Sequence, residues 1–113
     1  MTTPQLPNYL LMNRKSLDLS QEDVAYLLGA ESGEKVSRHE RFHREPGLSA
    51  ALAYEVIYKK PVSELFDGLY REVEQNVAAR AKSRAEKTGG RKVTRRNNRR
   101  RQVLSNLASL KRD

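Results

Sequence analysis

The chain has 113 residues, a formal net charge of +8 and no cysteine. A chain of this length holds one small domain with an appendage, and its core leaves little room for a deep enzyme pocket. The lack of cysteine excludes disulfides and cysteine zinc sites, and the sequence shows no signal peptide or membrane-spanning apolar run, so we expect a soluble cytoplasmic protein.

The first helix is predicted from Pro7 to about Leu17. Pro7 suits the first turn of a helix, because its missing N–H needs no partner there. We expect Tyr9, Leu10 and Leu17 to pack against the rest of the domain.

The segment SQEDVAYLLG predicts a sharply bounded second helix that begins at Gln21. Ser20 can cap its N-terminal amides, and Asp23 completes a pattern like a capping box. Gly29 suits a left-handed residue at the C-terminal end. One side of this helix carries its expected packing residues: Val24, Ala25, Leu27 and Leu28.

The segment EKVSRHERF predicts a short basic third helix, for which Ser32 is the natural cap. Its expected packing residues are Val36, His39 and His43. The residues expected to point outward are Glu34, Ser37, Arg38 and Arg41. An amphipathic helix alone is often only a surface helix, but two short helices joined by a small turn can place the second one in the major groove of DNA.

Pro46 and Gly47 mark a turn, and a fourth helix is predicted from about Leu48 to Tyr58. Its expected packing residues are Ala50, Ala51, Leu52, Ala53 and Val56. Pro61 ends this stretch. Ser63 is expected to cap a fifth helix that closes the core with Leu65 and Phe66.

The next segment, LYREVEQNVAARAKSRAEK, is rich in good helix formers. We expect the fifth helix to extend or a sixth helix to start after Gly68. Leu69, Val73 and Val77 recur at a helical spacing. This stripe could cover the core of its own domain or form the seam of a dimer.

Charge is unevenly distributed along the chain. Residues 1–79 hold 9 Lys and Arg against 12 Asp and Glu, a net of −3, whereas residues 80–113 hold 13 against 2, a net of +11. Gly89 and Gly90 predict a flexible break. The arginine-rich part could be a solvated disordered tail over residues 88–101, or an arm that follows the phosphate backbone. The last dozen residues could instead form a helix that docks on the domain or on a second copy.

The order of four segments resembles the Cro/C1-type, or XRE-like, helix-turn-helix regulators. These segments are SQEDVAYLLG, KVSRHER, REP and LSAALAYEVIYKKPVSELF, and with the first helix the resemblance covers about residues 5 to 67. The turn AESGEK is one residue longer than is usual in that family. Phe42 stands where the family commonly has a glycine at the end of the recognition helix.

The resemblance implies an all-α fold: a five-helix, lambda repressor-like domain at residues 1–67. A helical extension at 68–88 and a basic, partly disordered or amphipathic tail at 89–113 would follow. It also implies a sequence-specific transcriptional regulator of bacterial or phage type, associated with the nucleoid. Such a protein would bind double-stranded DNA as a homodimer and read the major groove with the helix at about 33–42.

The resemblance also implies roles for particular residues. Base contacts would come from Glu34, Lys35, Ser37 and Arg38. Arg38 is the foremost of these, because a guanidinium pairs bidentately with the guanine edge. Phosphate contacts would come from Gln21, Arg41, His43 and Arg44. Beyond the resembled region, the positive charge of the tail predicts further phosphate contacts from Arg95, Arg96, Arg99, Arg100 and Arg101. Arg14 would pair with Glu40 and fix the angle of the two-helix unit without touching a base.

Two other functions fit the same sequence. An antitoxin would bind its promoter with this fold and a toxin protein with a second surface. A nonspecific nucleic-acid binder would act through the arginine-rich tail alone. An enzyme or metal protein is not expected: His39 and His43 lie four residues apart, but no third ligand and no catalytic set accompanies them.

Overall fold

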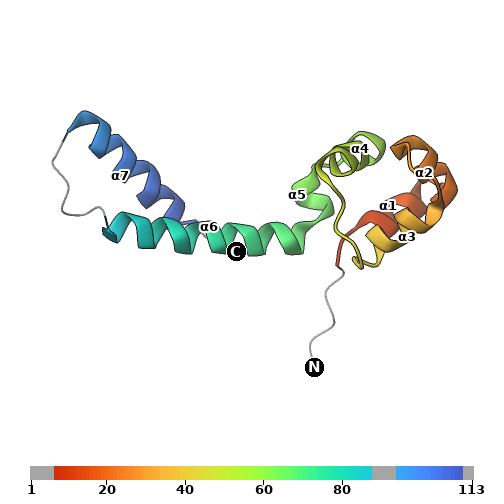
Figure 1. Cartoon of the computed structure of the whole chain (residues 1–113), viewed down its shortest axis with the longest axis horizontal. Coiled ribbons are helices and arrows are strands. Elements are labelled where there is room, and N and C mark those ends of the chain that lie inside the picture. Colours follow the sequence, from red (N-terminus) through yellow and green to blue (C-terminus); the bar gives the residue numbers. More distant parts are fainter. Residues whose placement is uncertain (1–6, 88–93, 111–113) are drawn as a thin grey trace, which may run out of the picture. The chain divides into compact units, whose positions relative to one another are not determined.

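The computed structural model describes residues 7–87 and 94–110, and every regular element in these two ranges is a helix, which confirms the all-α expectation. The chain divides into two compact units, Met1–Tyr70 and Arg71–Asp113, called here the first and second units. The helices are α1 (Leu10–Ser16), α2 (Gln21–Leu28), α3 (Gly33–Glu40), α4 (Leu48–Tyr58), α5 (Val62–Leu65), α6 (Asp67–Lys87) and α7 (Arg95–Ala108) (Figure 1). The first unit therefore ends slightly beyond residue 67, the expected domain boundary.

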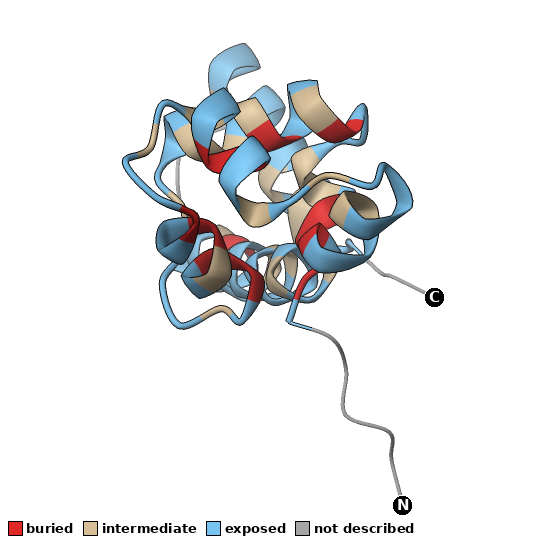
Figure 2. Cartoon of the chain, turned by 90° about the vertical axis from the view of Figure 1, so that its right-hand side faces the viewer, coloured by how far each residue is buried: buried red, intermediate tan, exposed pale blue. Residues whose placement is uncertain are grey.

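The core of the first unit is formed by the inward sides of α1 to α5. It contains Leu10, Val24, Ala25, Val36, Tyr54, Tyr58, Leu65 and Phe66. α2 packs on α3, α1 contacts α3 and α4, and α4 also contacts α2 and α5. Figure 2 shows that buried positions occupy only part of each helix, and the rest of its surface stays exposed.

α1 begins at Leu10 and not at Pro7, so the predicted start is wrong. The reason is Asn8, a buried residue whose Oδ1 accepts a hydrogen bond from the Leu10 N–H at 3.0 Å. The side-chain amide of Asn8 donates to the carbonyl oxygen of His39 at 2.9 Å. Asn8 therefore bonds the first residue of α1 and ties the start of this helix to the end of α3.

α2 has the ends that the sequence predicts. The hydroxyl of Ser20 accepts from the N–H of Asp23 at 3.0 Å, and the carboxylate of Asp23 accepts from the N–H of Ser20 at 2.9 Å. These two bonds form a complete capping box. Gly29 closes the helix with a φ of +73°, a left-handed conformation that glycine adopts without steric cost.

Several predicted packing residues are exposed instead. These are Tyr9, Leu17, Leu27, Leu52 and Val56, with exposed fractions of 36, 50, 54, 50 and 76%. On α4 the buried residues are Tyr54 and Tyr58, on the side opposite Leu52 and Val56. The three alanines of α4 are half-buried. Apolar spacing predicted the helix correctly but assigned the wrong side of it to the core.

α5 runs from Val62 to Leu65, so Ser63 lies inside the helix and does not cap it. The N–H of Val62 donates instead to the carboxylate of Glu55 at 2.9 Å. Leu65 and Phe66 are buried and close the core, as expected.

Phe42 follows α3 with a φ of +55°, in the left-handed region that glycine normally occupies. Its ring lies 6.3 Å from the ring of Phe66 and packs against the core. A left-handed conformation costs an ordinary residue roughly 1–2 kcal/mol. Burial of the aromatic ring offsets this cost, so a bulky residue ends α3 where the resembled family commonly has glycine.

α6 starts at Asp67 and continues through Gly68 without a break. α7 covers Arg95–Ala108, and the hydroxyl of its N-cap, Thr94, accepts from the N–H of Asn97 at 3.1 Å. Residues 95–101 are therefore helical, contrary to the disordered alternative, while Gly89 and Gly90 lie outside the described residues. Within the two described ranges, no helix has the length and apolar character needed to cross a bilayer.

Candidate nucleic-acid interface

The inward side of α3 is held tightly by the first unit. Val36, His39 and Glu40 have exposed fractions of 0, 1 and 7%. His43, the third expected packing residue, is exposed in the loop after the helix, so that prediction is wrong. Two of the three buried side chains are polar, and their hydrogen bonds fix how α3 sits on the other helices.

The turn between α2 and α3 is fixed by a side chain of α2. The carboxylate of Glu22 accepts from the N–H of Gly33 at 2.9 Å. A Cβ atom at Gly33 would lie 2.7 Å from that oxygen and 3.2 Å from the backbone carbonyl carbon of Gln21, so a side chain here would displace the Glu22 carboxylate and crowd the start of α2. Ser32 occupies the N-cap position, but its side chain makes no capping hydrogen bond, contrary to expectation.

An ion pair lies beneath the two helices. The guanidinium of Arg14 on α1 donates to the carboxylate of Glu40 on α3 at 2.7 and 3.2 Å. The side chains of Arg14 and Glu40 are only 12% and 3% exposed. Hydrogen bonding to Glu40 raises the pKa of Arg14, so the guanidinium stays charged.

Two further bonds extend this ion pair. The amide of Gln21 donates to the Glu40 carboxylate at 3.0 Å, and Arg14 also donates to the carbonyl oxygen of Leu19 at 2.9 Å. The side chain of Gln21, which was expected to contact a phosphate, is thus directed toward Glu40. The resulting network joins α1, α2 and α3 and sets the angle between them.

The end of α3 is also joined to α4. Nδ1 of His39 shares a 2.8 Å hydrogen bond with the hydroxyl of Tyr54, and the two rings meet edge to face with centroids 5.7 Å apart. Tyr54 in turn stacks on Tyr58 with ring centroids 5.9 Å apart. Burial raises the pKa of Tyr54 above its usual value and that of Tyr58 to about 12, so both tyrosines stay uncharged near neutral pH.

The stability of the first unit is expected to depend on the protonation of His39. Burial lowers the pKa of His39 below its usual 6.5, and the charges of Lys35 and Arg44 lower it further. The unfolded chain therefore binds a proton at a higher pH than the folded chain. The free energy of unfolding should be constant above about pH 6.5 and should fall below it, until the folded pKa is passed.

Urea unfolding at pH 7.5 and pH 5.0 measures this dependence. In His39→Asn the free energy of unfolding should differ less between pH 7.5 and pH 5.0 than in the unmodified chain, because the titrating imidazole is absent. The matched variant His43→Asn removes an exposed histidine and should behave like the unmodified chain. An equal fall in His39→Asn would show that other groups cause the pH dependence.

The outward side of α3 is charged. Nη2 of Arg38 lies 2.6 Å from the carboxylate of Glu34 one turn earlier, and these side chains are 49% and 67% exposed. Lys35 is also exposed, whereas Ser37 is half-buried. Beside α3 is a hollow of about 360 Å³, lined by Gly29, Ala30, Glu31, Ser32, Glu34, Lys35, Arg38 and Arg44. The turn, the helix and the loop after it thus present one continuous surface that carries three basic side chains.

Two of the expected phosphate contacts lie elsewhere. Arg41 and His43 line a different hollow of about 560 Å³, together with residues of α1 and the segment before it. Lys35, Arg38 and Arg44 thus line one hollow, whereas Arg41 and His43 line the other. The arginines of α7 belong to the second unit: Arg95, Arg96 and Arg99 are exposed, and Arg100 and Arg101 are half-buried.

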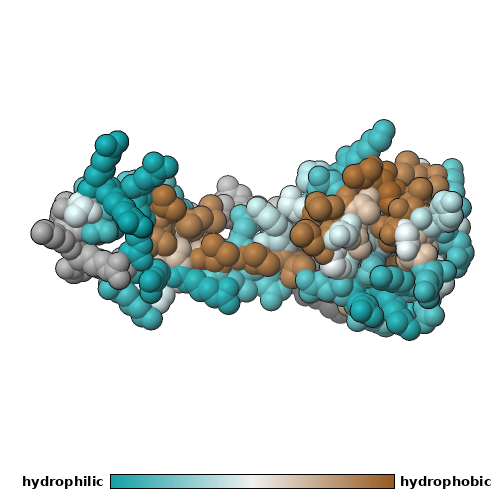
Figure 3. Space-filling view, turned by 45° about the horizontal axis from the view of Figure 1, so that its top comes forward, coloured by the Kyte–Doolittle hydropathy of each residue, from teal (hydrophilic) through white to brown (hydrophobic). Residues whose placement is uncertain are grey.

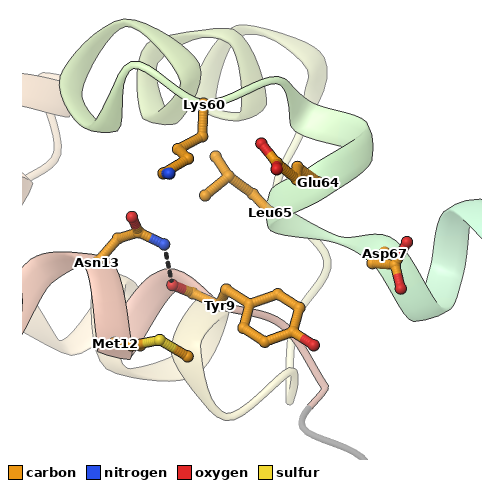
Figure 4. Close-up of a pocket in the computed structure, with 7 residues that line it drawn as sticks. All are labelled: Tyr9, Met12, Asn13, Lys60, Glu64, Leu65 and Asp67. Carbon is orange, nitrogen blue, oxygen red and sulfur yellow. Dashed lines mark hydrogen bonds between the residues drawn. The ribbon is translucent and has the colours of Figure 1, made fainter.

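A further pocket of about 430 Å³ lies between α1 and the segment that contains α5. It is lined by Tyr9, Met12, Asn13, Lys60, Glu64, Leu65 and Asp67. Figure 4 shows the side chain of Lys60 reaching into it from above, while the Asn13 amide donates to the Tyr9 carbonyl oxygen at 2.8 Å. None of the expected DNA contacts lines this pocket. The described part of the chain contains no group of three residues suited to hold a metal ion.

Sequence reasoning missed residues that position the site. Asn8 could have been found, because an asparagine two residues before an apolar helix commonly bonds the backbone there. Glu22 and Gly33 are eleven residues apart, and no short motif joins them. Tyr54 was overlooked because Leu52 and Val56 are more apolar and occur at an equally good helical spacing.

Comparison with family models, with curated proteins and with solved structures finds no match for this chain. The case for a function therefore depends on the geometry of the first unit and on the chemistry of its exposed residues.

Proposed function

We propose that this chain is a sequence-specific DNA-binding protein, a transcriptional regulator and not an enzyme, that acts as a homodimer. In this proposal α1 to α5 form a Cro/C1-like domain, α2 and α3 are its helix-turn-helix, and α3 enters the major groove. The turn and the loop after α3 lie against the flanking phosphates.

One observation supports this proposal above the others: α3 is rigidly fixed on one side and charged on the other. Glu40, His39 and Gly33 hold it to α1, α4 and α2. Lys35, Arg38 and Arg44 lie on the opposite, exposed surface. A helix that reads bases must keep its angle while it presents donors, because base contacts tolerate little displacement.

The chemistry of the exposed side follows from its side chains. Arg38 offers a planar fork of donors that matches the O6 and N7 acceptors of guanine. Glu34 holds this fork in the free protein at 2.6 Å. An exposed pair of this kind contributes only about 0.3–0.5 kcal/mol, so Arg38 can exchange Glu34 for a base edge at small cost. Glu34 is then able to accept from a cytosine amine, and Lys35 and Arg44 neutralise phosphates.

Selection of bound sequences from a random DNA pool with the full chain tests the proposal. At near-physiological salt we expect a discrete motif with two-fold symmetric half-sites. If the selection enriches no motif and the chain binds every sequence alike, the proposal is wrong and a nonspecific nucleic-acid binder is favoured.

The arginines of α7 are expected to add affinity without adding specificity. Replacing Arg95, Arg96 and Arg99 with glutamine keeps good helix formers on an exposed surface and removes three charges. Each lost phosphate contact should reduce the slope of log affinity against log salt by about 0.9. Fluorescence anisotropy across a salt series, on the selected site and on a scrambled site, measures the change.

The ratio of affinities for these two DNAs should stay within about threefold of that of the unmodified chain, because phosphates carry no sequence information. Collapse of this ratio would show that α7 reads sequence itself. The matched control replaces Lys59 and Lys60, two exposed lysines of the first unit, with glutamine. It should leave the slope of log affinity against log salt nearly unchanged.

A further inference from the structure

The described part of the second unit, residues 71–87 and 94–110, buries few side chains completely. Among its described residues only Ala81 is buried. The better-covered side of α6 carries Glu74, Ala78 and Ala85, of which two are alanines and one is charged. Units of about forty residues or fewer usually need a disulfide, a metal or an association partner, and the second unit, with 43 residues, is close to that size.

The same unit exposes large apolar side chains. Val73 and Val77 on α6 are 48% and 39% exposed, and Val103 and Leu110 on α7 are 48% and 45% exposed. Figure 3 shows that apolar side chains of this unit gather in a continuous band along the face in view. The part of α7 that carries them, residues 102–110, contains no charged residue, so burial of this part desolvates no charge.

The charges of α6 indicate what covers this band. Residues 67–76 hold three acidic residues and one basic residue, a net of −2, whereas residues 78–87 hold four basic and one acidic, a net of +3. A second α6 lying antiparallel places the acidic half of each copy beside the basic half of the other. A parallel arrangement places like charge beside like charge along the whole length.

We propose that two copies of this chain associate through their second units, with the α6 helices antiparallel and Val73 and Val77 packed near a two-fold axis. The exposed valines of α6 then pack against those of the second copy, and the proposed interface does not include the arginine-rich first turns of α7. This inference supplies the interface for the dimer of the proposed function. Its test uses no DNA, so base reading by α3 can hold where this interface fails.

Sedimentation equilibrium of the full chain over micromolar to submillimolar concentration tests the association. We expect a monomer–dimer equilibrium, and Val73→Asp and Val77→Asp should each raise its dissociation constant at least tenfold. Val56→Asp on α4 is the matched control, because Val56 is 76% exposed in the first unit, and it should leave the constant within about twofold. A monomer at every concentration, or a dimer that tolerates aspartate at both valines, would overturn the proposal.

The antiparallel arrangement is tested by spin labels, because the chain contains no native cysteine. Asn76→Cys lies near the proposed axis and Glu86→Cys near the end of α6, and both positions are exposed. A rise of 1.5 Å per residue in each of two opposed helices predicts that the two labels at position 86 lie farther apart along the helix axes, by roughly 30 Å, than the two labels at position 76. Equal distances at the two positions would indicate parallel helices and would overturn the proposed geometry.

Discussion

Replacing Glu40 with alanine is expected to lower the free energy of unfolding by about 3–5 kcal/mol, because it leaves the Arg14 guanidinium, which is only 12% exposed, without a counter-charge. Glu40 accepts hydrogen bonds from Arg14 at 2.7 and 3.2 Å and from Gln21 at 3.0 Å, and its side chain is only 3% exposed. The loss should be visible by urea denaturation followed by circular dichroism. It should also weaken DNA binding, because α3 loses the contact that fixes its angle to α1.

Two further variants separate the charge from the shape of Glu40. Glu40→Gln keeps the hydrogen-bond acceptor and should lose less stability than alanine. The double replacement Arg14→Leu with Glu40→Leu removes both charges and should be more stable than Glu40→Ala, since a buried pair replaced by apolar residues is often nearly neutral. If Glu40→Ala lost less than 1 kcal/mol, the network would not hold the helices together.

Replacing Arg38 with alanine is expected to weaken binding to the selected DNA site by about 1–3 kcal/mol, a loss of roughly 5- to 150-fold. On random DNA the loss of binding free energy should be much smaller. A guanidinium that pairs with one base edge contributes little to binding at sites that lack that base. The stability of the protein should change by less than about 0.5 kcal/mol, because the pair with Glu34 is exposed. Titrations on both DNAs, with urea unfolding of the same samples, measure the three quantities.

Arg41→Ala is the matched control for Arg38→Ala. Both arginines are exposed near the end of α3, but Arg41 lies beside the residues of α1 and Arg38 beside the turn. Arg41→Ala should change the affinity for the selected site and for random DNA by the same factor, as expected for a residue that contacts a phosphate or makes no contact. If the two variants discriminated between the DNAs in the same way, the assignment of base reading to Arg38 would be wrong.

The sequence predicted those parts of the fold that depend on local chemistry. The capping box of Ser20 and Asp23, the left-handed Gly29 and the extent of α4 follow from neighbouring residues and match the structure. Such features need only a few consecutive side chains and the backbone they bond. The start of α1 was missed because Asn8 bonds the carbonyl of His39, thirty-one residues away, as well as its own neighbour.

The side of α4 that packs could not be predicted from apolar spacing. Leu52 and Val56 are more apolar than tyrosine, yet Tyr54 and Tyr58 occupy the core. Tyr54 is buried with its hydroxyl bonded to His39, a polar partner fifteen residues away. The partner of the Tyr54 hydroxyl is known only when the helices are assembled, so apolar spacing could not predict that this tyrosine is buried.

In the candidate site, too, some features follow from neighbouring residues and others depend on contacts between distant parts of the chain. The charged residues of α3 and their outward side follow from the sequence, and the Arg14 to Glu40 pair followed from the family resemblance. The separation of Arg44 from Arg41 and His43 depends on the path of the loop after α3, which Phe42 sets with its φ of +55°. No local rule predicts a left-handed phenylalanine, because only its ring contact with Phe66 offsets the strain.

The measurement that tests the central claim most directly is a parallel selection from one random DNA pool with the unmodified chain and with Arg38→Ala. If α3 reads the major groove, the unmodified chain enriches a two-fold symmetric motif, and the variant loses base preference at one position of each half-site while keeping the others. The same motif from both proteins, or no motif from either, would contradict base reading by α3.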